Sequence, residues 1–421
     1  MRPSSMPCRA TPASTWLGAI ALMGTAFAFD CSVNASAAEN GPPPHECDRQ
    51  AAYPRDDAHV AEPVPFDRID AESAMAACRE ALDMYPGSPR FQLQLSRAYD
   101  KAGHADEAME LLNEAAASGY AGAQSALGAR HWYGEGVPQN AKKAVALLRP
   151  SAEQGNGYSQ ALLAFAYLQG DGISLDLEKA KHWAEKSAGQ GNEHGLELLA
   201  FLYEEGIGVP RDTAKARRLH AQSAERVAAL VERGFESTKD NLFSIAAHLF
   251  EQPYQSVDDI DITQVRGWIE CLAEDGHADA QYVLGRMYEQ GYATPRYHST
   301  PDLDKAYAWF RQAAANGSEV AYERLLDNYM QRLTLPPDYQ PVIAGDLMGR
   351  PLDEAKAWLQ ETAELGRMDS QLALGVAYHL GNGFERDLDK AQFWYKRAAA
   401  QGSDEAHDLL DQVQADIDRR N

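Results

Sequence analysis

Residues 161–191 read ALLAFAYLQGDGISLDLEKAKHWAEKSAGQG and divide into two halves around a pair of glycines. Before the glycines, Leu163, a small residue and Tyr167 are spaced so that they share one face of a helix. Gly170 and Gly172 then offer the left-handed backbone conformation that ends a helix at low cost. An aspartate suited to cap a second helix follows them. These residues therefore predict two antiparallel helices joined by a short turn.

The same pattern returns along the chain, with a closing glycine in seven copies and one copy, between Gly191 and Gly276, that has lost it. These glycines are Gly119, Gly155, Gly191, Gly276, Gly317, Gly366 and Gly402, and an alanine precedes each of them by three residues. Residues that cap helices fall in one register at Asn140, Asp176, Asp212, Asp302 and Asp387. The recurrence predicts about eight repeats. One helix pair cannot bury its apolar face alone, so we expect an all-α, right-handed solenoid of stacked helix–turn–helix units.

This pattern resembles the Sel1-like repeat family, which is related to the tetratricopeptide repeat. The resemblance covers residues 121–404, while residues 86–120 are closer to a plain tetratricopeptide unit. Two segments, at about residues 238–276 and 320–366, lack the Gly-x-Gly turn, so we expect less regular packing there. Residues 405–421 are expected to form a C-terminal capping helix.

The composition indicates a folded acidic protein. The chain carries 39 Lys and Arg against 62 Asp and Glu, a net charge of −23. Phosphate backbones and anionic lipid surfaces attract basic proteins, so we expect neither nucleic acid nor a membrane as a partner. Hydrophobic residues make up 45% of the chain, which is enough to form a packed core.

The first residues have the form of a secretory signal peptide. A basic start leads into an uncharged apolar run at residues 16–29, and small-x-small cleavage sites end at Ala28 and Ala37. The run is too short for an ordinary membrane span. Asp30 stands where a lipoprotein signal needs a small residue, so we expect no lipid anchor. We therefore predict that residues 1–37 are removed and that the mature chain is periplasmic or secreted, with no membrane insertion.

Two cysteines lie in the segment that follows. Cys47 and Cys78 flank a Pro- and Asp-rich stretch ahead of the first repeats. In an oxidising compartment a disulfide between them would attach an N-terminal arm, residues 38–85, to the first helix. The alternative is two unrelated free thiols.

The sequence carries no recognisable catalytic or cofactor motif. It has no GxxxxGK[ST] loop, no HExxH, no GxSxG and no C-x-x-C. The Gly-x-Gly pairs follow helices rather than strands, so they indicate turns. His131, His182, His194 and His220 are scattered along the chain. We therefore expect no enzyme activity, no cofactor and no metal site.

The remaining candidate for function is a surface. In tetratricopeptide-type solenoids the first helix of each repeat lines the concave face, and the resemblance implies the same arrangement here. Trp132, Phe165, Leu168 and Phe201 then form an apolar cluster on three neighbouring repeats, beside the acidic Glu204. Exposed apolar clusters commonly mark partner sites, so we predict that these five residues bind a protein. The alternative is that the rings only pack between adjacent helices.

Three functions follow as hypotheses. The resemblance implies an extracytoplasmic adaptor or regulator, since family members in bacterial envelopes restrain sensor kinases or support exopolysaccharide machinery. A second hypothesis is a secreted effector that engages host proteins. A third is a hydrolase of cell-wall or β-lactam substrates, which the resemblance to β-lactamase-like Sel1 proteins suggests. Those proteins carry a cysteine pair in each repeat, and this chain does not. The absent pairs and the absent nucleophile motif weigh against the hydrolase.

Overall fold

The computed structural model describes residues 42–56, 60–235, 238–251, 262–291, 301–334 and 352–420. The predicted signal peptide at residues 1–37 lies outside this part of the chain. The chain divides into two compact units, unit 1 (Met1–Ile262) and unit 2 (Thr263–Asn421). Each unit has buried apolar clusters of its own.

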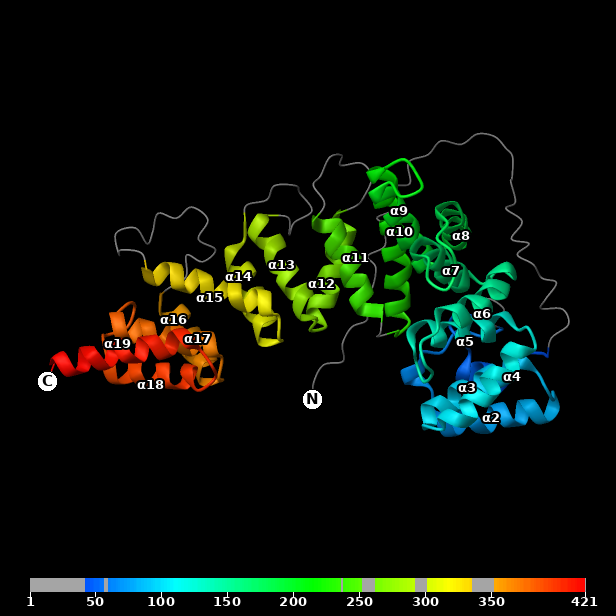
Figure 1. The fold of residues 1–421 in the computed structure, drawn as a ribbon, viewed down its shortest axis with the longest axis horizontal. Helices are drawn as coiled ribbons and strands as arrows, with labels where there is room; N and C mark the ends of the chain where they lie inside the picture. Colours follow the sequence, from blue (N-terminus) through cyan, green and yellow to red (C-terminus); the bar gives the residue numbers. More distant parts are fainter. Residues whose placement is uncertain are drawn as a thin grey trace, which may run out of the picture. The chain divides into compact units, whose positions relative to one another are not determined.

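Unit 1 is built from helices that follow one another along the chain (Figure 1). They are α1 (Glu46–Ala51), the 3-10 helix η1 (Phe66–Arg68), α2 (Ala71–Met84), α3 (Pro89–Ala102), α4 (Ala105–Ala117), α5 (Ala121–Tyr133), α6 (Ala141–Glu153), α7 (Gly157–Gln169), α8 (Leu177–Gly189), α9 (Glu193–Glu205), α10 (Thr213–Glu232) and α11 (Lys239–Glu251). The most extensive packing joins α3 to α4, α5 to α6, α7 to α8 and α9 to α10. The first helices of successive pairs also touch, α5 with α7 and α7 with α9.

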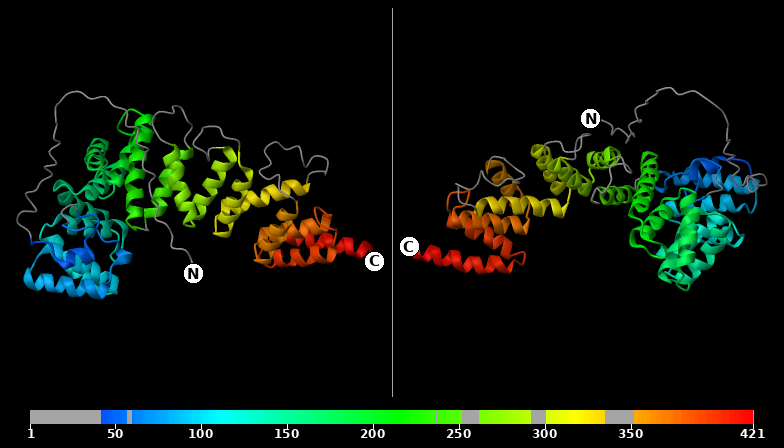
Figure 2. Two further views of the ribbon diagram at one scale, coloured as in Figure 1. Left: turned by 180° about the vertical axis from the view of Figure 1, so that it is seen from behind. Right: turned by 90° about the horizontal axis from the view of Figure 1, so that it is seen from above.

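Unit 2 continues with the same kind of element, as the turned views of Figure 2 also show. Its helices are α12 (Ile262–Glu274), which begins at the boundary, α13 (Ala278–Gln290), α14 (Leu303–Ala315), α15 (Glu319–Thr334), α16 (Leu352–Glu364), α17 (Met368–Leu380), α18 (Leu388–Ala399) and α19 (Asp404–Arg420). Here α13 pairs with α14 and α17 with α18. The described residues contain no strand. The expected all-α solenoid of helix–turn–helix repeats is confirmed.

The second helix of each regular repeat begins at the capping residue that the sequence indicates. The five side chains accept a hydrogen bond of 2.9–3.1 Å from the backbone N–H three residues later; they belong to Asn140, Asp176, Asp212, Asp302 and Asp387. Each bond satisfies one of the N–H groups that a helix leaves unpaired at its start. The caps therefore fix where each turn stops and the second helix begins.

Two positions show why the repeat pattern requires glycine. Gly172 has a φ of 69°, and a Cβ atom built on it would overlap the backbone carbonyl of Ala141 in the preceding repeat. Gly375, on the first helix of the last repeat, lies under the ring of Tyr395 on the second helix. A Cβ atom there would be 2.5 Å from Cδ1 of that ring. The first glycine permits close stacking between repeats, and the second permits close packing within one.

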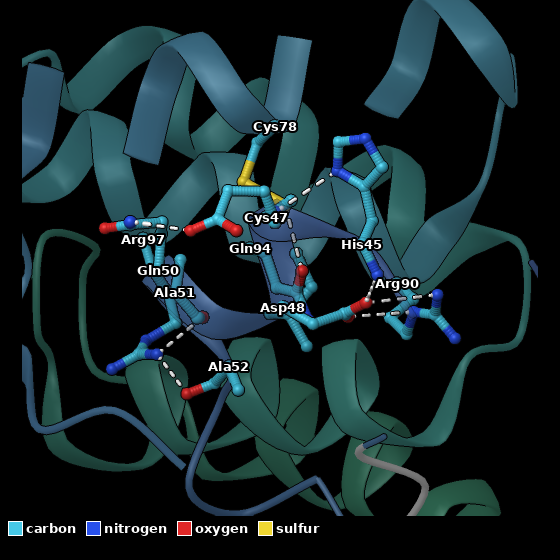
Figure 3. The surroundings of a disulfide bond; sticks show 12 residues. His45, Cys47, Asp48, Gln50, Ala51, Ala52, Cys78, Arg90, Gln94 and Arg97 are labelled. Atoms are coloured by element: carbon cyan, nitrogen blue, oxygen red, sulfur yellow. Dashed lines mark hydrogen bonds and ion pairs between the residues drawn. A yellow bond between two sulfur atoms is a disulfide. The ribbon is translucent and has the colours of Figure 1, made fainter. Parts of the chain in front are cut away.

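The arm ahead of the repeats contains a cysteine pair and makes polar contacts with α3 (Figure 3). The Sγ atoms of Cys47 on α1 and Cys78 on α2 lie 2.05 Å apart, at disulfide distance. The buried carboxylate of Asp48 accepts a 2.8 Å hydrogen bond from Gln94 and pairs with Arg90 at 3.1 Å, both on α3. A carboxylate buried in this way needs such partners, because an unpaired charge away from water is costly.

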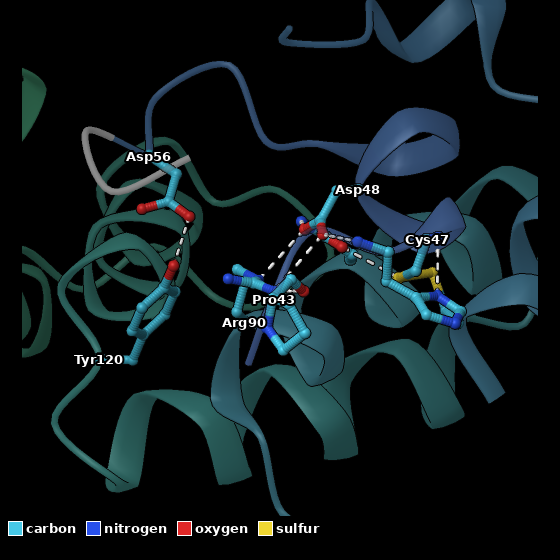
Figure 4. A network of polar contacts seen from close by, with 9 residues as sticks. Pro43, Cys47, Asp48, Asp56, Arg90 and Tyr120 are labelled. Atoms are coloured by element: carbon cyan, nitrogen blue, oxygen red, sulfur yellow. Dashed lines mark hydrogen bonds and ion pairs between the residues drawn. A yellow bond between two sulfur atoms is a disulfide. The ribbon is translucent and has the colours of Figure 1, made fainter. Parts of the chain in front are cut away.

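Further along, the arm crosses several repeats of unit 1. Asp56 accepts a hydrogen bond from Tyr120 at the start of α5 (Figure 4). The carbonyl of Arg55 accepts one of 2.8 Å from Asn156 at the start of α7. Arg233, which follows α10, pairs with Glu62 at 2.6 Å. The arm thus connects α5, α7 and the end of α10, all within unit 1.

Candidate protein-binding surface

The five residues predicted to bind a partner lie in the C-terminal halves of α5, α7 and α9. Trp132 is on α5, Phe165 and Leu168 are on α7, and Phe201 and Glu204 are on α9. Because α7 contacts both α5 and α9, the register of 36 residues brings equivalent positions onto neighbouring helices. We call the first four residues the apolar stripe.

The two phenylalanines are the exposed part of the apolar stripe. Phe165 leaves 37% of its surface accessible and Phe201 leaves 42%. The ring of Trp132 meets that of Phe165 edge to face, with centroids 6.1 Å apart. Apolar side chains that stay accessible in a contiguous patch commonly mark interaction sites. The phenylalanines are therefore the strongest contact candidates in the apolar stripe.

The other two members of the apolar stripe are half-buried. Trp132 packs against a buried cluster that includes Leu163, and Leu168 packs against that cluster and the next one, which includes Leu199. The alternative role, packing between adjacent helices, thus describes much of what Trp132 and Leu168 do. Their part in partner binding would therefore be smaller than that of the exposed phenylalanines.

One accessible aromatic residue near the apolar stripe was not predicted. Tyr133, next to Trp132, leaves 52% of its surface accessible, and its hydroxyl lies 3.4 Å from that of Tyr158. Tyr133 is the last residue of α5 and precedes Gly134, which ends the helix. Only its aromatic character could have pointed to it in the sequence.

Glu204 has partners within its own chain. Its carboxylate lies 3.5 Å from Nε2 of His220 on α10 and 3.4 Å from Nε2 of His248 on α11. A second carboxylate, that of Glu197, lies 3.1 Å from Nδ1 of His220. Burial lowers the pKa of His220, but the two carboxylates raise it, and the net shift is upward. Glu204 is therefore part of a cluster with histidines as well as a neighbour of the apolar stripe.

The histidines are scattered along the sequence, but the fold brings His220 beside His248. The imidazoles of His220 and His248 lie with centroids 4.7 Å apart. Within the described residues, Glu204, His220 and His248 are the one group of three side chains placed to share a metal ion. The spacings in sequence, 16 and 28 residues, match no metal-binding pattern, and His248 lies in a degenerate repeat. No motif could have indicated this cluster.

The fold and this surface define a class: an α-helical repeat protein built on tetratricopeptide-like units. Family comparison then narrows the class. The Sel1 repeat model matches residues 121–156, 157–192, 194–226, 278–318 and 369–403, and a tetratricopeptide repeat model matches residues 67–129. The chain is a Sel1-like repeat protein. Proteins with Sel1 repeats generally mediate protein–protein interactions, and the fold is typically a non-catalytic scaffold.

Curated relatives share only part of their length with the chain. A chitin synthase regulator of Saccharomyces cerevisiae is 28% identical over 124 residues, 30% of the chain and 16% of that protein. The DAP3-binding cell death enhancer 1 of Mus musculus is 30% identical over 173 residues, 36% of the chain and 33% of that protein. A Sel1-repeat-containing protein of Escherichia coli is 27% identical over 140 residues, 33% of the chain and 55% of that protein. The matched region therefore spans between a sixth and about half of each relative.

Solved structures of Sel1 proteins are similar over more of the chain. A Sel1 repeat protein from Oxalobacter formigenes is 26% identical, with a TM-score of 0.42, and the match covers 80% of this chain and 90% of that one. A protective antigen of uropathogenic Escherichia coli is 24% identical, with a TM-score of 0.31, covering 82% and 75%. Among the described residues, no helix combines the length and the apolar character needed to cross a bilayer.

Proposed function

We propose that this protein is an extracytoplasmic adaptor or regulator that binds another protein through the apolar stripe of unit 1. The observation that carries the proposal is the pair of accessible phenylalanines, Phe165 and Phe201, one on each of two touching helices. Aromatic anchors of this kind supply most of the binding energy at protein interfaces. The ring of half-buried Trp132 contacts that of Phe165 edge to face, and half-buried Leu168 packs against the buried clusters of both repeats.

The partner expected at the apolar stripe is an amphipathic segment with basic residues. Its apolar side would lie against Phe165 and Phe201. Its basic residues would be attracted by the negative field of a chain with net charge −23. An envelope sensor kinase or a component of polysaccharide machinery fits the adaptor role. The names of two relatives, a chitin synthase regulator and a DAP3-binding protein, support a role in binding other proteins.

The extracytoplasmic location rests on the N-terminal part of the chain. The sequence of residues 1–37 has the form of a signal peptide, and the Cys47–Cys78 pair at disulfide distance suits an oxidising compartment. Cell fractionation tests the location. Recovery in the periplasm supports an envelope adaptor, whereas recovery in the medium supports an effector that meets host proteins.

The binding role is tested with the mature chain and a matched pair of variants. Partners are cross-linked in the compartment where the protein is found, identified by mass spectrometry, and their affinities are measured by calorimetry. Phe165→Ala combined with Phe201→Ala should weaken binding by at least ~2 kcal/mol, as central aromatic anchors do. Phe393→Ala removes a more accessible ring, 53% exposed, from α18 in unit 2 and should leave the affinity unchanged. A folded double variant with wild-type affinity would remove the apolar stripe from the proposal.

A further inference from the structure

We propose that Glu204, His220 and His248 form a binding site for one divalent transition-metal ion, and that Zn²⁺ fits it best. The three side chains come from three successive helices of unit 1, α9, α10 and α11. Helix α10 packs against both of the others, so it brings the donors together. This site is separate from the binding role of the apolar stripe and does not depend on it.

The distances already approach those of a zinc site. Nε2 of His220 lies 3.5 Å from one oxygen of Glu204, and Nε2 of His248 lies 3.4 Å from the other. One donor atom from each of the three side chains falls within 4.8 Å of the others. Zinc bonds of about 2.0–2.1 Å at tetrahedral angles place donor atoms about 3.3 Å apart. Binding of one ion would draw the three donor atoms together from within 4.8 Å of one another to about 3.3 Å.

A second carboxylate orients the central ligand. Glu197, on α9, contacts Nδ1 of His220 with its two oxygens at 3.1 and 3.3 Å. If Nδ1 carries the proton and donates it to Glu197, Nε2 presents a lone pair toward Glu204. Metal-binding histidines commonly have such a carboxylate behind them. Nε2 of His220 is buried and makes no hydrogen bond in the described structure, although it lies beside Glu204.

Charge also favours a cation in this position. Glu197 and Glu204 bring two negative charges to two neutral imidazoles, and a divalent ion would balance them. The competing arrangement is a protonated His220 held between the two carboxylates. In that arrangement His248, whose ring centroid is 4.7 Å away, also directs Nε2 at Glu204. One metal ion accounts for the orientation of both rings.

The donor set selects the class of metal. Two imidazole nitrogens and one carboxylate oxygen suit zinc and its neighbours, whereas Mg²⁺ and Ca²⁺ prefer oxygen alone. Three protein donors leave a fourth tetrahedral position for water. A bound ion would connect α11, which begins a repeat without the usual Gly-x-Gly turn, to the regular repeat formed by α9 and α10.

The test uses the tag-free mature chain, stripped with a chelator and then titrated with ZnCl₂ by calorimetry at neutral pH. We expect one ion per chain, a melting temperature that rises with free zinc, and no effect of MgCl₂ at equal concentration. His248→Gln removes a direct ligand and should lower zinc affinity at least about 100-fold. Glu197→Gln removes only the carboxylate that orients His220 and should lower zinc affinity by about 10–100-fold, the usual effect of losing such a partner.

Matched variants separate the site from adventitious histidine binding. His182→Gln alters an exposed histidine on α8 outside the cluster and should bind zinc as the wild type does. Because the side chain of His248 is 37% exposed, its replacement should preserve the helical circular dichroism signal even if a His220 variant fails to fold. Binding that is absent in the wild type, or unchanged in folded His248→Gln, would overturn the proposal and leave a carboxylate–imidazole ion pair.

Discussion

The hydroxyl of Tyr120 donates a hydrogen bond of 2.6 Å to the carboxylate of Asp56, a residue 64 positions earlier in the chain. Asp56 is 3% exposed, and burial raises the pKa of Tyr120, so the hydroxyl keeps its proton and remains a donor. This bond attaches the N-terminal arm to the first Sel1 repeat. It is one of the contacts that turn the arm into part of unit 1.

Tyr120→Phe should therefore destabilise unit 1. Removal of the donor leaves a buried carboxylate with one partner fewer, which typically costs about 1–3 kcal/mol. Urea unfolding followed by circular dichroism measures the loss. Tyr99→Phe is the control, because the hydroxyl of Tyr99 accepts its hydrogen bond from Arg79 at the surface, and it should change stability by less than about 0.5 kcal/mol. Equal effects of the two substitutions would mean that the arm adds little to the stability of unit 1.

The cysteine pair gives a second prediction about the arm. Cys47 and Cys78 are separated by 31 positions in the sequence, and a disulfide that closes a loop of this size stabilises a protein by about 2–4 kcal/mol. Non-reducing peptide mapping of protein from the oxidising compartment should recover the two cysteines in one linked fragment. Reduction, or the double change Cys47→Ala and Cys78→Ala, should lower the midpoint of urea unfolding. Alkylation of both thiols without prior reduction would contradict the bridge.

The repeat pattern in the sequence was sufficient to predict the helices, because each position in it has a local cause. Caps such as Asp176 and turn glycines such as Gly172 act on residues within one turn of themselves. The path of the arm and the cluster around His220 have no such signal. Asp56 meets Tyr120, and His220 meets His248, only because the stacked helices bring distant segments together. Contacts of that kind depend on the fold and leave no periodic trace in the sequence.

The apolar stripe shows an intermediate case. Helical spacing places its members at two positions of the repeat on α5, α7 and α9: Phe165 and Phe201 share one position, and Trp132 and Leu168 share the other. Spacing alone could not separate the accessible Phe165 from the half-buried Leu168, because both positions recur at the same interval. The degree of exposure depends on how deeply each helix sits between its neighbours, which is a property of the packed array.

A glycine pair in unit 2 tests the packing within one repeat. Gly375→Ala would place a methyl group 2.5 Å from the ring of buried Tyr395 and should destabilise the unit by about 1–3 kcal/mol. Gly267→Ala, on α12, meets no atom within 4 Å and should stabilise the helix by up to about 1 kcal/mol. Thermal unfolding of both variants measures the difference. A neutral Gly375→Ala variant would show that α17 and α18 can separate without cost.

The helix caps predict a dependence of stability on pH. In Asp302 and Asp387 the hydrogen bond from the backbone N–H of the lysine three residues later holds the pKa below its usual range. The unfolded chain then binds more protons than the folded chain between the folded and unfolded pKa values, so stability rises with pH there. The contribution is complete above about pH 4, the usual aspartate value, and is lost as the pH falls through the folded value. Replacing both residues with Asn, the residue that caps α6 at position 140, keeps the oxygen acceptor without a titrating group.

The melting temperature of this double variant should therefore fall less steeply than that of the wild type below about pH 4. Asp411→Asn, at an exposed position on α19, is the control and should leave the slope unchanged. Parallel curves for the wild type and the double cap variant would show that these carboxylates do not contribute to acid sensitivity.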